Sequence, residues 1–142
     1  MLTGAHLAGL SLASVKMGLH HGLCHVLGGT ANVPHGIANS ILLPHAIRFN
    51  ADTTASQLLP AAEAMGISLN GISREVTLEA LAQKVFDLVG KMNLPQRLRD
   101  AGVKESELPH LAGLGFQNRT VQNNPKPITE PAQIEALLRA AW

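Results

Sequence analysis

A short stretch of the chain, Gly18 to Gly36, holds four of its seven histidines and its only cysteine. His21 and His25 lie four residues apart, so on a helix their imidazole rings share one face, one turn apart. His35 follows a Gly-Gly pair and a proline-containing loop, and a backbone that turns back there would bring its ring beside the other two. Three convergent imidazoles suit Zn, Fe, Ni or Cu rather than Mg or Ca. The spacing therefore predicts a transition-metal site.

Spacing alone leaves the choice of residues open. His20 and Cys24 are also four residues apart, on the adjoining face of the same helix. Two or three histidines without a carboxylate are an incomplete set, because a catalytic site usually has three or more protein ligands and one open position. A helical metal-binding domain without catalysis is therefore an alternative to an enzyme.

Other candidate residues carry weaker signals. We predict Cys24 to be a small buried hydrophobic residue rather than a nucleophile, because no cationic group is assured beside it. His6 and His45 lie in apolar stretches and are expected at core or interface positions. His110 follows a proline, and we expect it at a solvated position on a helix.

The elements that must position these residues are helices. Aromatic residues make up only 3% of the chain, so Ala, Leu, Val, Ile and Gly must build the core, and this composition favours helices packed on helices. We find no convincing strand and predict an all-α fold, a helical bundle that forms a single domain over residues 1–142. The expected helices cover residues 3–27, 35–49, 53 or 54 to 65, and 78–92, two shorter segments within 94–103 and 104–116, and a last segment after residue 129. Residues 117–127 are expected as a polar loop. The apolar residues expected along one side of a helix are Leu78, Leu81, Val85, Leu88 and Met92 in the segment 78–92, and Ile134, Leu137, Leu138 and Ala141 in the last segment.

Glycine, proline and capping residues set the expected boundaries of these helices. Gly28-Gly29 should end the first helix, and Pro44 should kink or divide the second. A turn is expected at residues 50–52, followed by a helix capped by a threonine, and Thr129 is expected to cap the last helix. The first helix carries small apolar residues on every face, which predicts that it is buried, yet it starts at residue 1 without a capping residue.

Composition excludes several function classes. The formal net charge is +1 and no Lys/Arg block is present, so nucleic-acid binding has little support. The apolar start lacks the basic segment of a signal peptide and is too short for a membrane span, which needs about 20 apolar residues. A single cysteine excludes an internal disulfide framework and fits a reducing cytoplasm.

The stretch "HHGLCHVLGGTANVPHGIANSILLPHAIRFN", His20 to Asn50, resembles the signature of the iron-containing (group III) alcohol dehydrogenase family. That signature has two histidines separated by three residues, a Leu-Gly turn, Pro-His-Gly leading to Ala-Asn, then Leu-Leu-Pro and Phe-Asn. The resemblance continues through "LPQRLRDAGVKESELPHLA" and "NNPKPIT" to the final "AAW". It covers essentially the whole chain, but only the C-terminal helical domain of the family.

The resemblance implies roles for three histidines. His21 and His35 match metal ligands of the family, and His25 matches a histidine near the substrate and the nicotinamide, where it could relay the alcohol proton. The other two ligands of the family, an Asp and a His four residues later, lie upstream of this region. The implied activity is hydride transfer between alcohols and aldehydes or ketones and a nicotinamide cofactor, with Fe²⁺ (Zn²⁺ being possible) as Lewis acid.

The same resemblance implies partners. NAD or NADP would be bound mainly by an N-terminal α/β domain that this chain does not contain, so the isolated chain is expected to be inactive. The apolar first helix should associate with that domain or with a second copy of the chain, as a homo-oligomer.

A related subfamily offers a second reading of the signature. "GLHHGLCHVLGGT" is particularly similar to maleylacetate reductases, thought to work without a metal. Their Pro-His pair is typically followed by Ala-Glu-Thr-His, whereas this chain continues Gly36-Ile37-Ala38-Asn39, the metal-dependent pattern. We favour the metal-dependent enzyme, because the second half of the signature carries a ligand.

Overall fold

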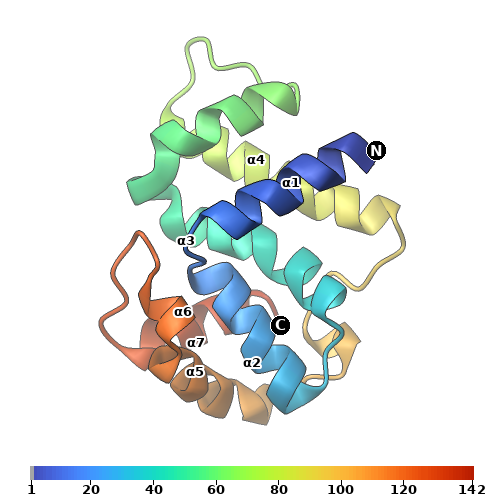
Figure 1. Ribbon diagram of the computed structural model, residues 1–142, viewed down its shortest axis with the longest axis vertical. Helices are drawn as coiled ribbons and strands as arrows, with labels where there is room; N and C mark the ends of the chain where they lie inside the picture. Colours follow the sequence, from blue (N-terminus) through green and yellow to red (C-terminus); the bar gives the residue numbers. More distant parts are fainter. Residues whose placement is uncertain (1) are drawn as a thin grey trace.

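The computed structural model describes residues 2–142, and within this range the secondary structure is helical without any strand, which confirms the all-α prediction (Figure 1). The uncapped start expected at residue 1 lies outside the described residues. The elements in chain order are α1 (Leu2–Ser14), α2 (Leu19–Ala31), α3 (His35–Ala64), α4 (Arg74–Lys91), the short 3₁₀ turns η1 (Arg99–Ala101) and η2 (Glu105–Glu107), α5 (Leu108–Gln117), α6 (Arg119–Gln122) and α7 (Pro131–Ala140).

The predicted helix over residues 3–27 is wrong, because the chain breaks between α1 and α2. Gly18 has an extended backbone and precedes the first residue of α2. The side chain of Asn124 accepts a hydrogen bond from the Leu19 backbone N–H at 3.2 Å, which gives α2 a start of its own. A hydrogen bond between residues distant in the sequence therefore divides a segment that the local sequence pattern predicts to be one helix.

The predicted end of that helix at Gly28-Gly29 is also wrong. The helix continues to Ala31 and ends at Asn32, which has a left-handed backbone with φ of 54°. Asparagine tolerates this conformation better than most residues, and the Asn32 N–H donates to the Leu27 carbonyl as in a common helix termination.

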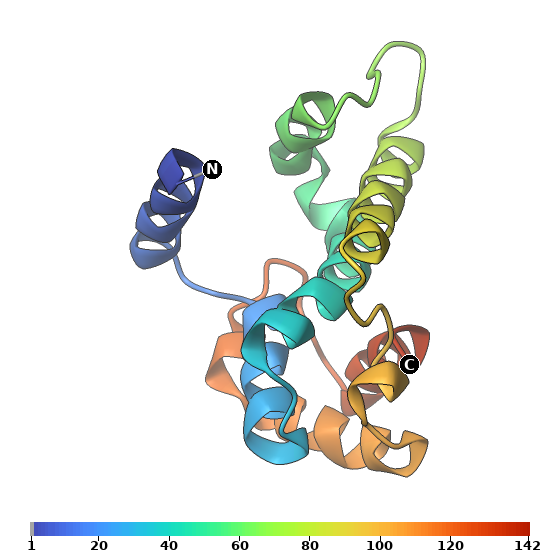
Figure 2. The same ribbon diagram turned by 90° about the vertical axis from the view of Figure 1, so that its right-hand side faces the viewer.

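Two helices predicted within residues 35–65 are one continuous element, α3. The turn expected at residues 50–52 is absent, and two polar side chains in this part of α3 bond to carbonyls of the helix itself. The Asn50 amide donates to the Ala46 carbonyl, and the Thr54 hydroxyl donates to the Asn50 carbonyl. Pro44 lies inside the helix without ending it, and the helix changes direction along its length (Figure 2).

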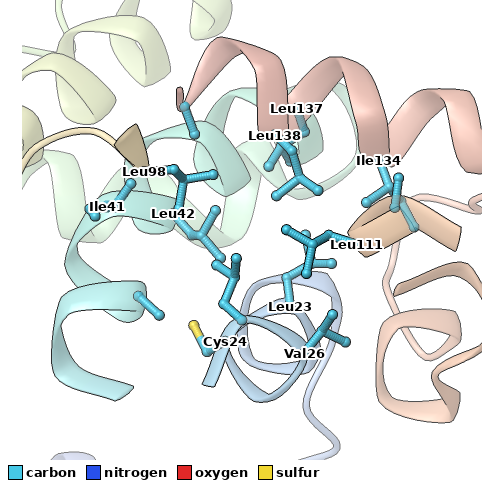
Figure 3. Packing of buried hydrophobic residues seen from close by; sticks show 14 of the residues in the cluster. Leu23, Cys24, Val26, Ile41, Leu42, Leu98, Leu111, Ile134, Leu137 and Leu138 are labelled. Atoms are coloured by element: carbon cyan, nitrogen blue, oxygen red, sulfur yellow. The ribbon is translucent and has the colours of Figure 1, made fainter. Parts of the chain in front are cut away.

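The structure has two hydrophobic clusters. The larger one joins α2 and the start of α3 to α5, α6 and α7, with the side chains of Leu23, Leu42, Leu111 and Leu138 meeting at its centre (Figure 3). The smaller one packs the second part of α3 against α4, the helix predicted over 78–92. The larger cluster fixes α2 against the start of α3, the two elements that carry the predicted site.

The C-terminal region closes the larger cluster. The predicted apolar side of the last helix is confirmed, because Ile134, Leu137, Leu138 and Ala141 are all buried. Thr129 is not the cap: Glu130 occupies the capping position and forms a capping box with Gln133. Residues 117–127, expected as a loop, contain the single-turn helix α6.

Helix α1 stands apart from the rest of the chain (Figure 2). None of its residues is buried, and Leu7 and Leu10 are 58% and 53% exposed. The prediction of a buried first helix is therefore wrong for this chain, since no apolar surface within residues 2–142 covers α1. Among the same residues, none of the helices combines the length and apolar character that a membrane span requires.

Candidate metal centre

His21, His25 and His35 converge at the junction of α2 and α3. One ring nitrogen of each lies within 4.8 Å of one from each of the others. The ring centroids are 4.5 Å apart for His21 and His25 and 4.9 Å apart for His21 and His35. The convergence predicted from spacing is thus present in the structure.

The alternative pair, His20 and Cys24, does not share a centre. The Cys24 side chain is fully buried in the larger hydrophobic cluster (Figure 3), and burial raises the pKa of its thiol to about 12. The His20 ring instead lies between α2 and α3, with its Nε2 atom 3.0 Å from the Asn39 carbonyl oxygen. Cys24 is a buried hydrophobic residue, as predicted.

The start of α2 is held by two asparagines that sequence reasoning missed. Asn124 Oδ1 accepts from the Leu19 N–H and from the Asn50 amide, and Asn124 Nδ2 donates to Asn50 Oδ1. A Cβ atom on Gly18 would come within 3.0 Å of Asn124 Oδ1, so glycine permits this approach. In the sequence, the only sign of this role is that both asparagines are polar residues of segments that carry the family resemblance: Asn50 ends the segment from His20, and Asn124 lies in "NNPKPIT".

The middle of α2 lies directly against α6. A Cβ atom on Gly22 would lie 2.6 Å from Val121 Cγ2 and 2.9 Å from the Val121 backbone nitrogen. Because Gly22 is adjacent to His21 and three residues from His25, this contact sets the height and rotation at which α2 presents both rings.

His35 is the first residue of α3, and its backbone is held by Asn39. The Asn39 side-chain amide donates to the His35 carbonyl at 2.7 Å. A carbonyl only accepts, so the bond from His20 to the Asn39 carbonyl requires a proton on His20 Nε2. Asn39 therefore connects His20 on α2 to His35 on α3.

The electrostatics favour neutral imidazole at His21 and at the adjacent His20. Partial burial and the neighbouring rings of His25, His35 and His20 lower the pKa of His21. Burial also lowers the pKa of His20, against the hydrogen bond to Asn39. A neutral ring keeps the nitrogen lone pair that a metal ion needs.

A cavity of about 550 Å³ lies beside the cluster, on the side that faces α1. His20, His21, His35 and Asn39 line one wall, and residues of α1 and the segment after it, including Leu12 and Lys16, line another. His25 and His35 are exposed, so the cluster can be reached from outside this chain.

The remaining histidines lie elsewhere. His110 is exposed on α5, as predicted. His6 is exposed on α1, so it is not a core residue here, and an interface position stays a prediction. His45 is half-buried, and burial together with the Arg48 and Arg97 charges lowers its pKa to about 4.

The three imidazoles fit a transition-metal ion. Tetrahedral ligation at zinc–nitrogen distances of about 2.0 Å places ligand nitrogens about 3.3 Å apart, so modest side-chain rotations would bring nitrogens now within 4.8 Å onto one ion. The cluster contains no carboxylate.

The comparisons with known proteins agree on one protein family. The family model described as "Fe-containing alcohol dehydrogenase family, C-terminal" matches residues 1–142. Lactaldehyde reductase of Escherichia coli is 38% identical over 142 residues, which is 100% of this chain and 37% of that protein. Maleylacetate reductase of Burkholderia cepacia is 33% identical over 141 residues, 99% of this chain and 36% of that protein.

A solved structure agrees in fold. The crystal structure of a 1,3-propanediol oxidoreductase is 34% identical and superposes with a TM-score of 0.80, over 88% of this chain and 32% of that one. The chain therefore spans about a third of the length of the proteins that it matches.

Proposed function

Because this chain belongs to the iron-containing alcohol dehydrogenase family, in which it matches the C-terminal region, we propose that it is the metal-bearing domain of an enzyme that interconverts alcohols and aldehydes or ketones. The observation that carries this proposal is the convergence of three imidazoles at the α2–α3 junction. We propose that NAD or NADP accepts or donates the hydride and is bound mainly by an N-terminal α/β domain, since the relatives are nearly three times as long.

In this proposal His21 and His35 hold the metal, Fe²⁺ or alternatively Zn²⁺, together with ligands outside this chain. When bound, the ion would supply Lewis-acid stabilisation of the alkoxide. The hydrogen bond from Asn39 to the His35 backbone keeps the start of α3 turned toward α2. The contact of Gly22 with Val121 keeps His21 facing His35.

His25 is proposed to relay the proton of the alcohol. Its ring lies beside that of His21 and is exposed, so it can reach both a substrate oxygen and water. A neutral imidazole can accept the alcohol proton on oxidation, and the imidazolium can return it on reduction.

The roles can be tested in the complete enzyme. We expect His21→Ala or His35→Ala to lose bound metal and turnover together, measured by elemental analysis and cofactor absorbance. His25→Asn should keep the metal, lower turnover by about 10²–10⁴-fold and change the pH profile. His110 is an exposed histidine outside the cluster, so His110→Ala is the matched control and should change neither the bound metal nor the turnover. Retained metal and activity in both ligand variants would refute the ligand assignment.

A metal-free reductase of the maleylacetate type is a second candidate, favoured by the "GLHHGLCHVLGGT" segment and the 33% identity to such an enzyme. Full turnover of the complete enzyme after exhaustive chelation would favour this candidate. Loss of turnover that is restored by Fe²⁺ or Zn²⁺ would favour the metal-dependent enzyme.

We also propose that the N-terminal domain covers the apolar face of α1. The side chains of Leu7, Leu10 and Leu12 are exposed in this chain, and exposed apolar patches of this kind mark interaction surfaces. The cavity between α1 and the imidazole cluster would then lie where the two domains meet.

A further inference from the structure

A second group of polar side chains lies where α3, α4, α7 and the segment after α4 meet. It surrounds a pocket of about 260 Å³ that shares no lining residue with the cavity beside the imidazole cluster. His45 and Arg48 come from α3, Gln83 from α4, and Gln96 and Arg97 from the following segment. His45 and Arg48 lie within the signature segment, and Gln96 and Arg97 lie within the segment that continues it, but the proposed reaction uses none of these residues.

The charges around this pocket leave a net positive balance. Arg48 is paired with Glu79, with Nη2 2.7 Å from Oε1, so this arginine is already neutralised. Arg97 is exposed and takes part in none of the ion pairs formed among residues 2–142. His45 is neutral at pH 7, because burial and the two arginines lower its pKa to about 4. Arg97 is therefore the lining cation that has no ion-pair partner among residues 2–142. The side-chain amides of Gln83 and Gln96 donate to Asp87 and to the Phe86 carbonyl.

An apolar pocket of about 380 Å³ adjoins the polar one. His45, Arg48 and Ala140 line both, so the two form one continuous site with a polar end and an apolar end. The apolar end is lined by Phe49 of α3 and by Ala136 and Leu137 of α7.

We propose that this composite pocket binds a small aliphatic monocarboxylate. The carboxylate would lie at the polar end, where Arg97 supplies the charge and the unpaired edge of Arg48 supplies donors. The hydrocarbon tail would lie along Phe49 and Leu137, where it loses contact with water. A single net positive charge matches a monoanion better than a phosphate dianion, and the apolar end has no use in binding inorganic phosphate.

The test is an NMR titration of the metal-free 142-residue chain with hexanoate. We expect a Kd of about 1 mM, ordinary for a ligand of this size, with amide shifts at Arg97, Ala136 and Ala140. Hexanol and inorganic phosphate, each of which lacks one half of the ligand, should bind at least about tenfold more weakly, which is the loss of one favourable contact.

Variants at exposed positions separate the two ends of the pocket without disturbing the core. Arg97→Gln should weaken hexanoate binding about tenfold and leave hexanol binding unchanged, and Ala136→Leu should weaken both by filling the apolar end. Arg74→Gln removes the same charge at an exposed position outside the pocket and should have no effect. Four results would each overturn the proposal. Hexanoate could bind Arg97→Gln as tightly as the unchanged chain, or phosphate could bind as tightly as hexanoate. Hexanoate could also fail to bind, or it could shift only amides of residues 21–35.

Discussion

Replacing Gly22 by alanine should destabilise the protein, although alanine is the better helix former. The new Cβ would lie 2.6 Å from Val121 Cγ2 and 2.9 Å from the Val121 backbone nitrogen. The valine methyl can rotate away, but the backbone of α6 is held by the Asn118 side chain, which accepts from the Thr120 N–H at 2.8 Å. The clash therefore has to separate α2 from α6.

The magnitude follows from two opposing effects. Overpacking of this kind costs about 1–3 kcal/mol. Removing a helical glycine returns about 0.5–1 kcal/mol. The two ranges leave a net loss in the free energy of unfolding of about 0–2.5 kcal/mol, about 1 kcal/mol at their midpoints, which for a chain of 142 residues lowers Tm by about 3–4 °C.

Gly29 is the matched control in the same helix. A Cβ atom there has no neighbour within 4 Å, so Gly29→Ala should raise Tm by about 2–3 °C. Both variants are followed by the helical circular dichroism signal during thermal unfolding. If Gly22→Ala is as stable as Gly29→Ala, α2 does not lie against α6 as described, and the packing that orients His21 and His25 must be sought elsewhere.

Three further predictions concern other residues. The Cys24 thiol should react with a disulfide reagent at pH 8 only on unfolding, because it is buried and its pKa is raised to about 12; rapid labelling of the native chain would contradict its placement in the core. The free energy of unfolding should fall as the pH is lowered from about 6.5 to about 4, because the unfolded chain binds a proton on His45 that the folded chain takes up only near pH 4. His45→Gln should flatten the pH dependence in this window, and an unchanged profile in urea titrations would exclude the contribution of His45. Replacing Leu7 and Leu10 by glutamine should reduce self-association of the 142-residue chain in sedimentation experiments. If the variant and the unchanged chain associate equally, the apolar face of α1 does not mediate self-association.

The local sequence pattern predicted much of the helical structure of this protein. The helix predicted over residues 78–92 is present as α4, but only part of its predicted apolar side is covered: Leu78 and Leu81 are buried, whereas Leu88 and Met92 are exposed. The predicted side of the last helix is buried in full. The i, i+4 relation of His21 and His25 also survives, since both lie within α2. Membership of the family followed from a thirty-residue signature that the family comparison confirms.

Boundaries that depend on distant residues could not be predicted. The start of α2 at Leu19 is set by Asn124, more than a hundred residues away. Helix α3 continues through the expected turn, where Asn50 bonds to Asn124 and Asp52 pairs with Lys126, both more than seventy residues away. The spacing of apolar residues in the sequence carries no information on such polar contacts.

For the site, the sequence determined the types of the candidate ligands and the pair on one helix face. Only the tertiary structure decided that His35 joins that pair and that Cys24 and His20 do not. The reason is physical: the rotation of α2 is set by which of its faces packs into the larger hydrophobic cluster, and that face takes Leu23, Cys24 and Leu27. The opposite face is then left to the imidazoles, where the turn at Asn32 returns the chain beside them.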